Sequence, residues 1–455
     1  MPLSKNDVVT LQITDITSEG NGVGRADGLA VFVPMTAVGD RLKVRITKVL
    51  KNYAYGIVEQ MIEQSSDRIE ADCPVFRLCG GCAYRHISYE AELRLKQRQV
   101  YEALARIGGA QFEQQRIIPS PQQEQYRNKA QYPVRADEHG RCIAGFFARR
   151  SHRLVQSDKC YLQPPVFAEI VTDVIAFANM YSITPYNEQT GKGLLRHIYL
   201  RCAEATGQLM VCLVINGKSL PHTDELIHSL IAKYPQIQSV VLNLNNENTN
   251  VILGNKTITL YGADVIVDEL RGIKVALSPL SFYQVNRRGA ERLYDIAEQY
   301  ACPAPVSLLL DLYCGAGTIG LSMAHQADRL IGVDIVPEAI ENARDNAVRN
   351  GVHNCEFLCA DASRAATELS ERGLRPDVVI LDPPRKGSDY ACLKAIAQMS
   401  PDRIVMISCN PATAARDIKI LRDEFGYRPT AATAVDLFPR TVHCETVCLI
   451  SKKAL

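Results

Sequence analysis

Several features are scarce in this chain of 455 residues, and most of these absences narrow what it can be. No apolar run approaches the roughly 20 residues of a membrane-spanning helix, so we expect no membrane association. The first ten residues contain Lys5 and Asp7 but no apolar stretch typical of a secretory signal, so a cytoplasmic protein is expected. Tryptophan is absent, which excludes nothing. Hydrophobic residues make up 47%, which excludes a mostly disordered chain.

Neither sign of charge is in excess over the whole chain, because the formal net charge is only +1. Residues 70–160, however, carry fifteen basic and ten acidic side chains. Such a basic segment is compatible with a nucleic-acid surface, although solvated faces often show the same excess. The fifteen cysteines are an odd number in a chain without an export signal. Metal binding or catalysis is therefore a better explanation for them than disulfides.

The patterning predicts three domains. Residues 1–63 alternate apolar and polar positions in about five short strands separated by glycine-rich turns, which is typical of a small OB-like β-barrel. Residues 64–270 begin with a cysteine cluster and continue as an α+β domain with an antiparallel sheet and one helix near 222–233. Within this range a helix is expected from Tyr89 to about Ile107.

Residues 271–455 alternate apolar strands with helices from about residue 305 onward. This order predicts an α/β fold with a doubly wound, Rossmann-like sheet. Ligands of such sheets bind at the carboxyl ends of the strands. The residues that follow each predicted strand are therefore the candidates for ligand contact.

The first three strands of this domain end in residues suited to a nucleoside ligand. A glycine-rich turn containing Tyr313 and Gly315 follows the first strand, while Asp334 and Asp361 end the next two. Asp334 can accept hydrogen bonds from a ribose, and Asp361 is placed to meet an adenine edge. Each acidic residue could instead cap the following helix. The turn also contains the dinucleotide pattern G-x-G-x-x-G, but Asp311 before it and a later Asp-Pro-Pro fit S-adenosylmethionine better.

The fourth and fifth strands end in residues suited to chemistry on a nucleobase. Asp382-Pro383-Pro384-Arg385 follows the fourth strand, and Cys409 ends the fifth. C5 of a pyrimidine cannot attack a methyl sulfonium until a thiolate has added to C6, so Cys409 is the candidate nucleophile. It should lie near positive charge that lowers its pKa, although most cysteines are simply buried. Glu445 is the candidate base that removes the C5 proton, unless it is an ordinary surface carboxylate.

These motifs together resemble the RNA uracil-5-methyltransferase family, over essentially the whole chain. The resemblance rests on DLYCGAGTIGL, DPPRKG, SCNPAT, DLFPRTVHCET and SFYQVN, with His-Cys-Glu where many members read His-Val-Glu. It implies that Cys409 is the nucleophile and Glu445 the base. It also implies that the helical stretch near 91–118 packs on the C-terminal domain. It also implies a set of contacts to S-adenosylmethionine or the target base, namely Gln284, Tyr313, Asp334 and Asp382.

The cysteine cluster reads Cys73-x5-Cys79-Gly-Gly-Cys82, and Cys160 is a plausible fourth ligand. Four thiolates suit either zinc or a [4Fe–4S] cluster. A triplet with one distant ligand favours iron–sulfur over the two close pairs common in zinc sites. The ribosomal-RNA branch of the family resembles this chain in having the same spacing, which strengthens the iron–sulfur prediction and implies a structural or RNA-positioning role.

The residues around AVFVPMTAVGDRLKVRI resemble the TRAM RNA-binding barrel. Bacterial members that act on transfer RNA usually lack both this barrel and the cysteines, so the resemblance implies 23S ribosomal RNA as the substrate, with transfer RNA as the rival. A monomer is expected. Cytosine-5 methylation is disfavoured because residues 382–388 contain no cysteine, and a non-catalytic RNA-binding assembly factor is a third alternative. Phosphate contacts are expected from Arg127, Asn128, Lys129, Arg149, Arg150 and Arg153, unless these residues only provide solubility.

Overall fold

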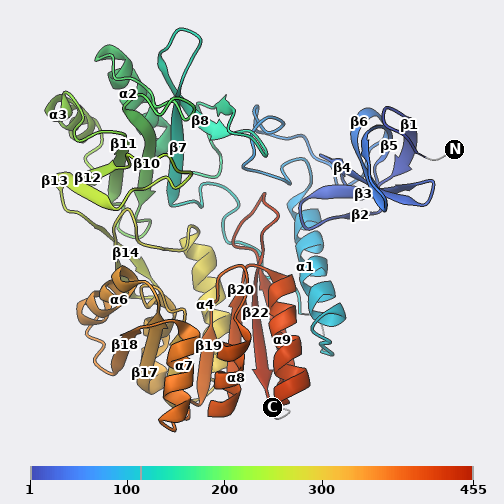
Figure 1. The fold of residues 1–455 in the computed structure, drawn as a ribbon, viewed down its shortest axis with the longest axis vertical. Coiled ribbons are helices and arrows are strands. Elements are labelled where there is room, and N and C mark those ends of the chain that lie inside the picture. The colour runs from blue at the N-terminus through green and yellow to red at the C-terminus, as the bar shows by residue number, and fades with distance from the viewer. Residues whose placement is uncertain (1–2, 113–114, 453–455) are drawn as a thin grey trace.

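The structure is a computed structural model that describes residues 3–112 and 115–452. Within these residues three large sheets follow one another along the chain, and a short hairpin lies between the second and the third (Figure 1). No helix in the described part of the chain is both long and apolar enough to cross a bilayer.

The N-terminal sheet has six strands in the order β1-β5-β6-β4-β3-β2. Side chains alternate along these strands, so Val31, Val33 and Ala54 fill the core while their neighbours face outward. The expected barrel is therefore present, with one strand more than about five because 8–16 is split in two. The strands are β1 (Val8–Gln12), β2 (Asp15–Ile16), β3 (Asn21–Ala26), β4 (Leu29–Pro34), β5 (Arg41–Val49) and β6 (Tyr53–Glu63).

The central sheet has seven strands in the order β13-β12-β11-β10-β7-β8-β9. Two expectations for this region were wrong. Helix α2 (Pro165–Met180) was missed, although its buried side chains recur at helical spacing, namely Phe167, Ile170, Val171, Val174 and Ala178. Strands β11 and β12 pair in parallel, because α3 (Thr223–Lys233) forms a crossover between them. The strands are β7 (Lys129–Ala136), β8 (Cys142–Phe147), β9 (Leu154–Gln156), β10 (Leu195–Cys202), β11 (Leu209–Ile215), β12 (Ile237–Leu244) and β13 (Lys256–Gly262).

Helix α1 (Tyr89–Arg106) begins at Ser88, whose side chain accepts a hydrogen bond from the Ala91 N–H, and it ends before Gly108 and Gly109. The expected helical stretch to residue 118 is thus too long, and residues 113–114 lie outside the described residues. One side of α1 packs on the barrel core, and another packs on α9 of the C-terminal sheet (Figure 1). The helix therefore connects the first and last parts of the chain.

The C-terminal sheet has the order β18-β17-β16-β19-β20-β22-β21. Its first five strands are parallel, and β22 runs antiparallel to both neighbours. The chain reverses its winding between β16 and β19, which places the ligand crevice at the carboxyl ends of these strands. The strands are β16 (Val306–Leu312), β17 (Ala327–Asp334), β18 (Cys355–Cys359), β19 (Val378–Leu381), β20 (Arg403–Ser408), β21 (Arg428–Val435) and β22 (Glu445–Ser451).

Helices cover both faces of this sheet, which makes it the expected doubly wound α/β fold (Figure 1). The hairpin β14 (Ile266–Leu270) and β15 (Ile273–Leu277) spans the predicted boundary between 270 and 271 and packs on α4 and α6. The three domain ranges stay a prediction. The helices are α4 (Arg287–Ala301), α5 (Thr318–Met323), the 3-10 turn η1 (Ala324–Gln326), α6 (Pro337–Arg349), α7 (Ala362–Glu371), α8 (Tyr390–Met399) and α9 (Pro411–Phe425).

Candidate functional site

The glycine-rich turn between β16 and α5 forms the floor of a crevice at the switch point of the sheet. Tyr313, Gly315 and Gly317 all have φ between 56° and 76°, a left-handed conformation that allows a sharp turn after the strand. A Cβ on Gly320 would come within 2.8 Å of Asp311 Oδ2, the atom that accepts a hydrogen bond from the Gly320 N–H at 3.0 Å. The turn therefore exposes backbone to the crevice and holds α5 close to the sheet.

Two acidic residues predicted to contact the nucleoside lie beside this turn. Asp334 accepts hydrogen bonds from the N–H groups of Gly315 and Val336, each at 2.9 Å, so its carboxylate is fixed against the glycine-rich turn. Asp361 is exposed and accepts from the N–H groups of Ser363 and Arg364 as the cap of α7. The capping role is therefore present at Asp361, which also lines the crevice.

Gln284 enters the crevice from the segment 278–286, which lies against the central sheet. The buried Arg201 of β10 donates to the carbonyl oxygens of Ser278 at 2.6 Å and Ser281 at 2.7 Å. The Asn128 side chain donates to the Gln284 carbonyl at 2.9 Å. The central domain therefore positions Gln284. Asn128 is buried in this contact, which contradicts its expected role as a phosphate ligand.

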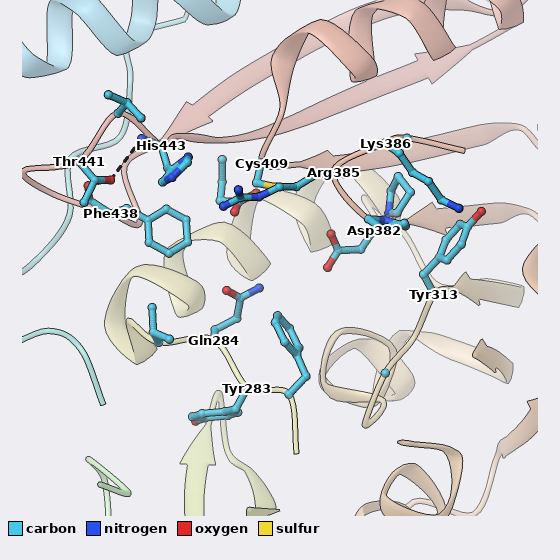
Figure 2. A pocket seen from close by; sticks show the side chains of 18 of the residues that line it. Tyr283, Gln284, Tyr313, Asp382, Arg385, Lys386, Cys409, Phe438, Thr441 and His443 are labelled. Carbon is cyan, nitrogen blue, oxygen red and sulfur yellow. Dashed lines mark hydrogen bonds between the residues drawn. The ribbon is translucent and has the colours of Figure 1, made fainter. Parts of the chain in front are cut away.

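Cys409 and Glu445 stand opposite each other on neighbouring strands. Ser408 of β20 pairs with Thr446 of β22, so Cys409, which follows Ser408, faces Glu445, which precedes Thr446. Figure 2 shows Cys409 with Arg385 beside it, and Asp382 and Gln284 directed toward the same space. Five groups from four segments thus converge on one region of the crevice.

The carboxyl groups of this region are held in a low-dielectric environment. Burial and, to a smaller extent, the Asp382 charge raise the pKa of Glu445 to about 8, against the opposing effect of Arg385. Burial alone raises the pKa of Asp382 to about 7, and burial also raises that of Asp311 to about 8. A carboxyl whose pKa lies near 8 is mostly protonated at neutral pH, and its ionised form is a stronger base than an ordinary carboxylate, as a general base requires.

The thiol of Cys409 differs from the expectation that its pKa would be lowered. Burial raises the pKa, and the Glu445 charge raises it further. The Arg385 guanidinium lowers it but does not outweigh the other two effects. The positive charge that we expected near the thiol is present. Its effect is too small, because a buried thiolate beside a carboxylate is costly.

The crevice is part of a cavity of about 2090 Å³ that extends from Cys409 to the N-terminal barrel. Of the basic residues expected to contact phosphates, Arg127, Lys129, Arg149 and Arg150 line it. Arg153 is not among the described lining residues. Tyr313, Asp334, Asp361, Asp382, Gln284, Gly315, Cys409 and Glu445 all line the cavity.

A buried charge network that the sequence analysis missed holds the segment before Glu445. The Lys96 ammonium of α1 donates to Glu92 Oε1 and Asp436 Oδ1, each at 2.7 Å, and to the Phe438 carbonyl at 3.0 Å. The side chains of all three charged residues are fully buried. Only the i, i+4 spacing of Glu92 and Lys96 gave a signal in the sequence, and it pointed to an exposed pair. Asp436 lies 340 residues from Lys96.

The four candidate metal ligands Cys73, Cys79, Cys82 and Cys160 line a second cavity of about 260 Å³. Arg85 lines it too, and its Nη2 is buried without a hydrogen-bond partner. In the described part of the chain no three His, Cys, Asp or Glu side chains are close enough together to hold a single metal ion. The structure therefore does not show a metal centre. Four thiols and an unsatisfied cationic donor around one cavity nevertheless fit an anionic thiolate cluster.

The chain is similar to known RNA methyltransferases over nearly its whole length. The sequence model for tRNA (uracil-5-)-methyltransferase matches residues 88–453, and that of the TRAM domain matches residues 2–58. An uncharacterized RNA methyltransferase of Halalkalibacterium halodurans is 44% identical over 99% of this chain and 98% of its own. A second one, of Clostridium tetani, is 39% identical with the same coverage.

Among solved structures, the Pyrococcus abyssi tRNA (uracil-54, C5)-methyltransferase in complex with S-adenosyl-L-homocysteine is similar over the full architecture. It is 26% identical, with a TM-score of 0.77 over 97% of this chain and 100% of its own. The similarity covers the barrel, the central domain and the C-terminal sheet together.

Proposed function

Because this chain belongs to the tRNA (uracil-5-)-methyltransferase family and carries a TRAM domain, we propose that it methylates C5 of a uridine in 23S ribosomal RNA. S-adenosylmethionine, the methyl donor of this family, supplies an electrophilic methyl group. The observation that carries the proposal is the placement of Cys409 opposite Glu445 at the carboxyl end of the sheet.

The proposed reaction needs a nucleophile and a base that both reach the same uracil ring. The ends of β20 and β22 supply them as Cys409 and Glu445. The Cys409 thiolate forms a bond to C6, which turns C5 into an enolate-like carbon. C5 then takes the methyl group as the sulfonium–methyl bond breaks. Glu445 accepts the C5 proton, and the electron pair of that bond expels the thiolate from C6. The uridine must leave its stack to reach Cys409.

The residues beside the glycine-rich turn fit the methyl donor. Asp334 has its carboxylate fixed against the Gly315 N–H and is available to ribose hydroxyls. Gln284, Tyr313, Gly315 and Asp382 line the same cavity as Cys409, and so does Asp361, the candidate contact to the adenine. Arg385 stands beside the thiol and favours its ionised form.

We further propose that Cys73, Cys79, Cys82 and Cys160 hold a [4Fe–4S] cluster. Their convergence on one cavity with the unpartnered Arg85 Nη2 supports this assignment. The methyl transfer involves no change of oxidation state, so the group would serve as a structural support for the segment around these cysteines.

Transfer RNA is the second candidate substrate, because the similar P. abyssi enzyme is named for uracil 54 of tRNA. The test incubates anaerobically purified protein with radiolabelled S-adenosylmethionine and unmodified ribosomal or transfer RNA, with wild type and Cys409→Ala in parallel. We expect label in 5-methyluridine of ribosomal RNA that disappears in the variant.

The other outcomes are distinct. Label in transfer RNA alone would support the reaction but show that the substrate is transfer RNA. Label that persists in Cys409→Ala would show that Cys409 is not the nucleophile. Absence of label with either RNA would favour the non-catalytic RNA-binding alternative.

A further inference from the structure

The outward face of the barrel carries three aromatic side chains that its core does not use. Phe32 lies on β4, and Tyr53 and Tyr55 lie on β6. Strand alternation directs Val31 and Ala54 inward, where both are fully buried, and leaves the three rings half-buried on the opposite face. None of the three belongs to the buried barrel core. Their presence is therefore not explained by the stability of that core.

The three rings form one cluster rather than separate surface residues. Phe32 pairs directly with Tyr55 across the parallel strands β4 and β6. Ring centroids are 5.4 Å apart for Phe32 and Tyr53, 5.8 Å for Phe32 and Tyr55, and 5.6 Å for Tyr53 and Tyr55. Contact among the rings restricts their rotation, so the cluster presents aromatic surface with little conformational entropy left to lose on binding.

The cluster adjoins the cavity that contains the candidate catalytic residues. Tyr55 lines this cavity together with its neighbours Gly56 and Ile57, and so do Cys409 and Glu445 at the other end. A lysine and an ion pair lie beside Tyr55. Lys48 is its exposed cross-strand partner on β5, and Arg150 of the central domain is ion-paired with Glu19 of the barrel at 2.6 Å. A polyanion that enters the cavity from the barrel side therefore meets aromatic rings and cations together.

We propose that Phe32, Tyr53 and Tyr55 form a stacking platform for unpaired nucleobases of the RNA, next to the nucleotide that enters the crevice. This inference rests on the proposed RNA substrate. It adds a second RNA-binding site on the barrel and the requirement that the bound RNA be unpaired there. Bases can stack on side chains only where they are unstacked from one another, so the platform selects single-stranded or looped RNA over duplex. The rings read no particular base, because every base has a π-face.

The test measures RNA binding without methyl transfer. The probe is a single-stranded RNA of about 12 nucleotides, within the site size of one such barrel, that contains 2-aminopurine as a fluorescent base. Fluorescence titration without S-adenosylmethionine gives the affinity of the full-length protein. We expect Tyr55→Ala to weaken binding roughly 5- to 100-fold, as the loss of one stacked base does, and to reduce the quenching of 2-aminopurine. The same RNA annealed to its complement should bind wild type and variant equally.

Two further variants keep the result interpretable. Tyr55→Phe retains the ring and should bind like wild type. Tyr261→Ala removes a comparably exposed tyrosine from β13, which is not among the described residues that line the cavity, and should have no effect. Thermal unfolding of each variant checks the barrel, and Phe32→Ala provides an independent removal of the platform.

The outcomes separate this inference from the proposed function. Wild-type affinity and quenching in both Tyr55→Ala and Phe32→Ala would overturn the proposed platform, even if uridine methylation takes place. The aromatic cluster would then bind a partner other than RNA. Weakened binding to single-stranded RNA supports the platform even if no methyl transfer is found.

Discussion

The catalytic crevice and the cysteine cavity share four lining residues, namely Gly81, Cys82, Arg127 and Lys129, but are built in different ways. The crevice is formed where parallel strands end, so the sheet itself brings its acidic groups and thiol together. The cysteines of the second cavity lie in irregular segments, packed beside strands β7 and β8. A site of the first kind is organised by the fold. A site of the second kind depends on the group that it holds.

The two sites meet at Arg440. Its carbonyl accepts hydrogen bonds from the N–H groups of Ala83 at 2.7 Å and Tyr84 at 3.1 Å, directly after Cys82. Its own N–H donates to Glu92 Oε1 at 2.7 Å, within the buried network of α1. Arg440 adopts φ 69°, a strained conformation for a residue with a side chain. Contacts from both sides therefore fix the segment that leads to Glu445.

The largest expected effect concerns the crevice alone. Glu445→Gln should reduce methyl transfer about 10²- to 10⁴-fold, because the C5 proton loses its acceptor. The thiolate then cannot leave, so a covalent protein–RNA adduct should accumulate and be visible on a denaturing gel with labelled RNA. Glu356→Gln, in an exposed ion pair with Arg329, is the matched control. Full activity in Glu445→Gln would contradict the assignment of Glu445 as the base. The iron content should be unchanged in both variants, because neither residue is a candidate cluster ligand.

Lys96 should stabilise the segment that connects the two sites. Lys96→Met leaves Glu92 and Asp436 as buried carboxylates without their cation, and we expect a loss of about 3–5 kcal/mol in the free energy of unfolding in urea. Adding Glu92→Gln should recover part of this loss. The exposed Lys394→Met should change stability by less than about 0.5 kcal/mol. An unchanged free energy of unfolding in Lys96→Met would mean that the network does not stabilise the segment.

The cysteine cavity should be separable from the cofactor crevice. Cys82→Ser is expected to lose bound iron and the associated visible absorption after anaerobic reconstitution, whereas Cys355→Ser, at the amino end of β18, should retain both. Affinity for S-adenosylhomocysteine, measured by calorimetry, should change by no more than about twofold in either, because neither thiol is among the proposed contacts to the methyl donor. Unchanged iron in Cys82→Ser would contradict the ligand assignment.

The smallest expected effect is a shift of the pH profile. Glu445, with a pKa of about 8, must be ionised to accept a proton, and the Cys409 thiol, whose pKa is raised, must be ionised to attack. The rate should therefore rise with pH through about 8. Arg385 lowers the pKa of both groups, so Arg385→Met should move the profile to higher pH by on the order of one unit. The exposed Arg375→Met should leave the profile in place.

The free energy of unfolding should fall as the pH rises, whereas the rate of methyl transfer should increase. Glu445, Asp382 and Asp311 bind protons more tightly folded than unfolded, since burial raises each pKa. Stability contributed by these protonated carboxyls is complete below about pH 4 and is lost as the pH rises through about 7 to 8. Glu445→Gln should therefore flatten this decline.

The parts of the site that follow strands could be predicted from the sequence, because the position of a residue at a strand end determines where it lies in a doubly wound sheet. Cys409 and Asp382 are of this kind, and Glu445 lies at the same edge because it begins the antiparallel strand β22. The network of Lys96 and Asp436 could not be predicted, because it depends on how α1 packs against a distant part of the chain. The direction of the Cys409 pKa was wrong for a related reason. The motif shows which charges are near, but not how much burial opposes them.

The hydrogen bonds from Ala83 and Tyr84 to the Arg440 carbonyl have a consequence for protection against oxygen. Coupling free energies between two sites are reciprocal. RNA that stabilises the segment around Arg440 must also stabilise the neighbouring cysteine segment, and slow the opening that exposes its thiols to oxidants. Under the proposed function, the RNA-bound state would therefore also be the one in which the cysteines are best shielded from oxidants.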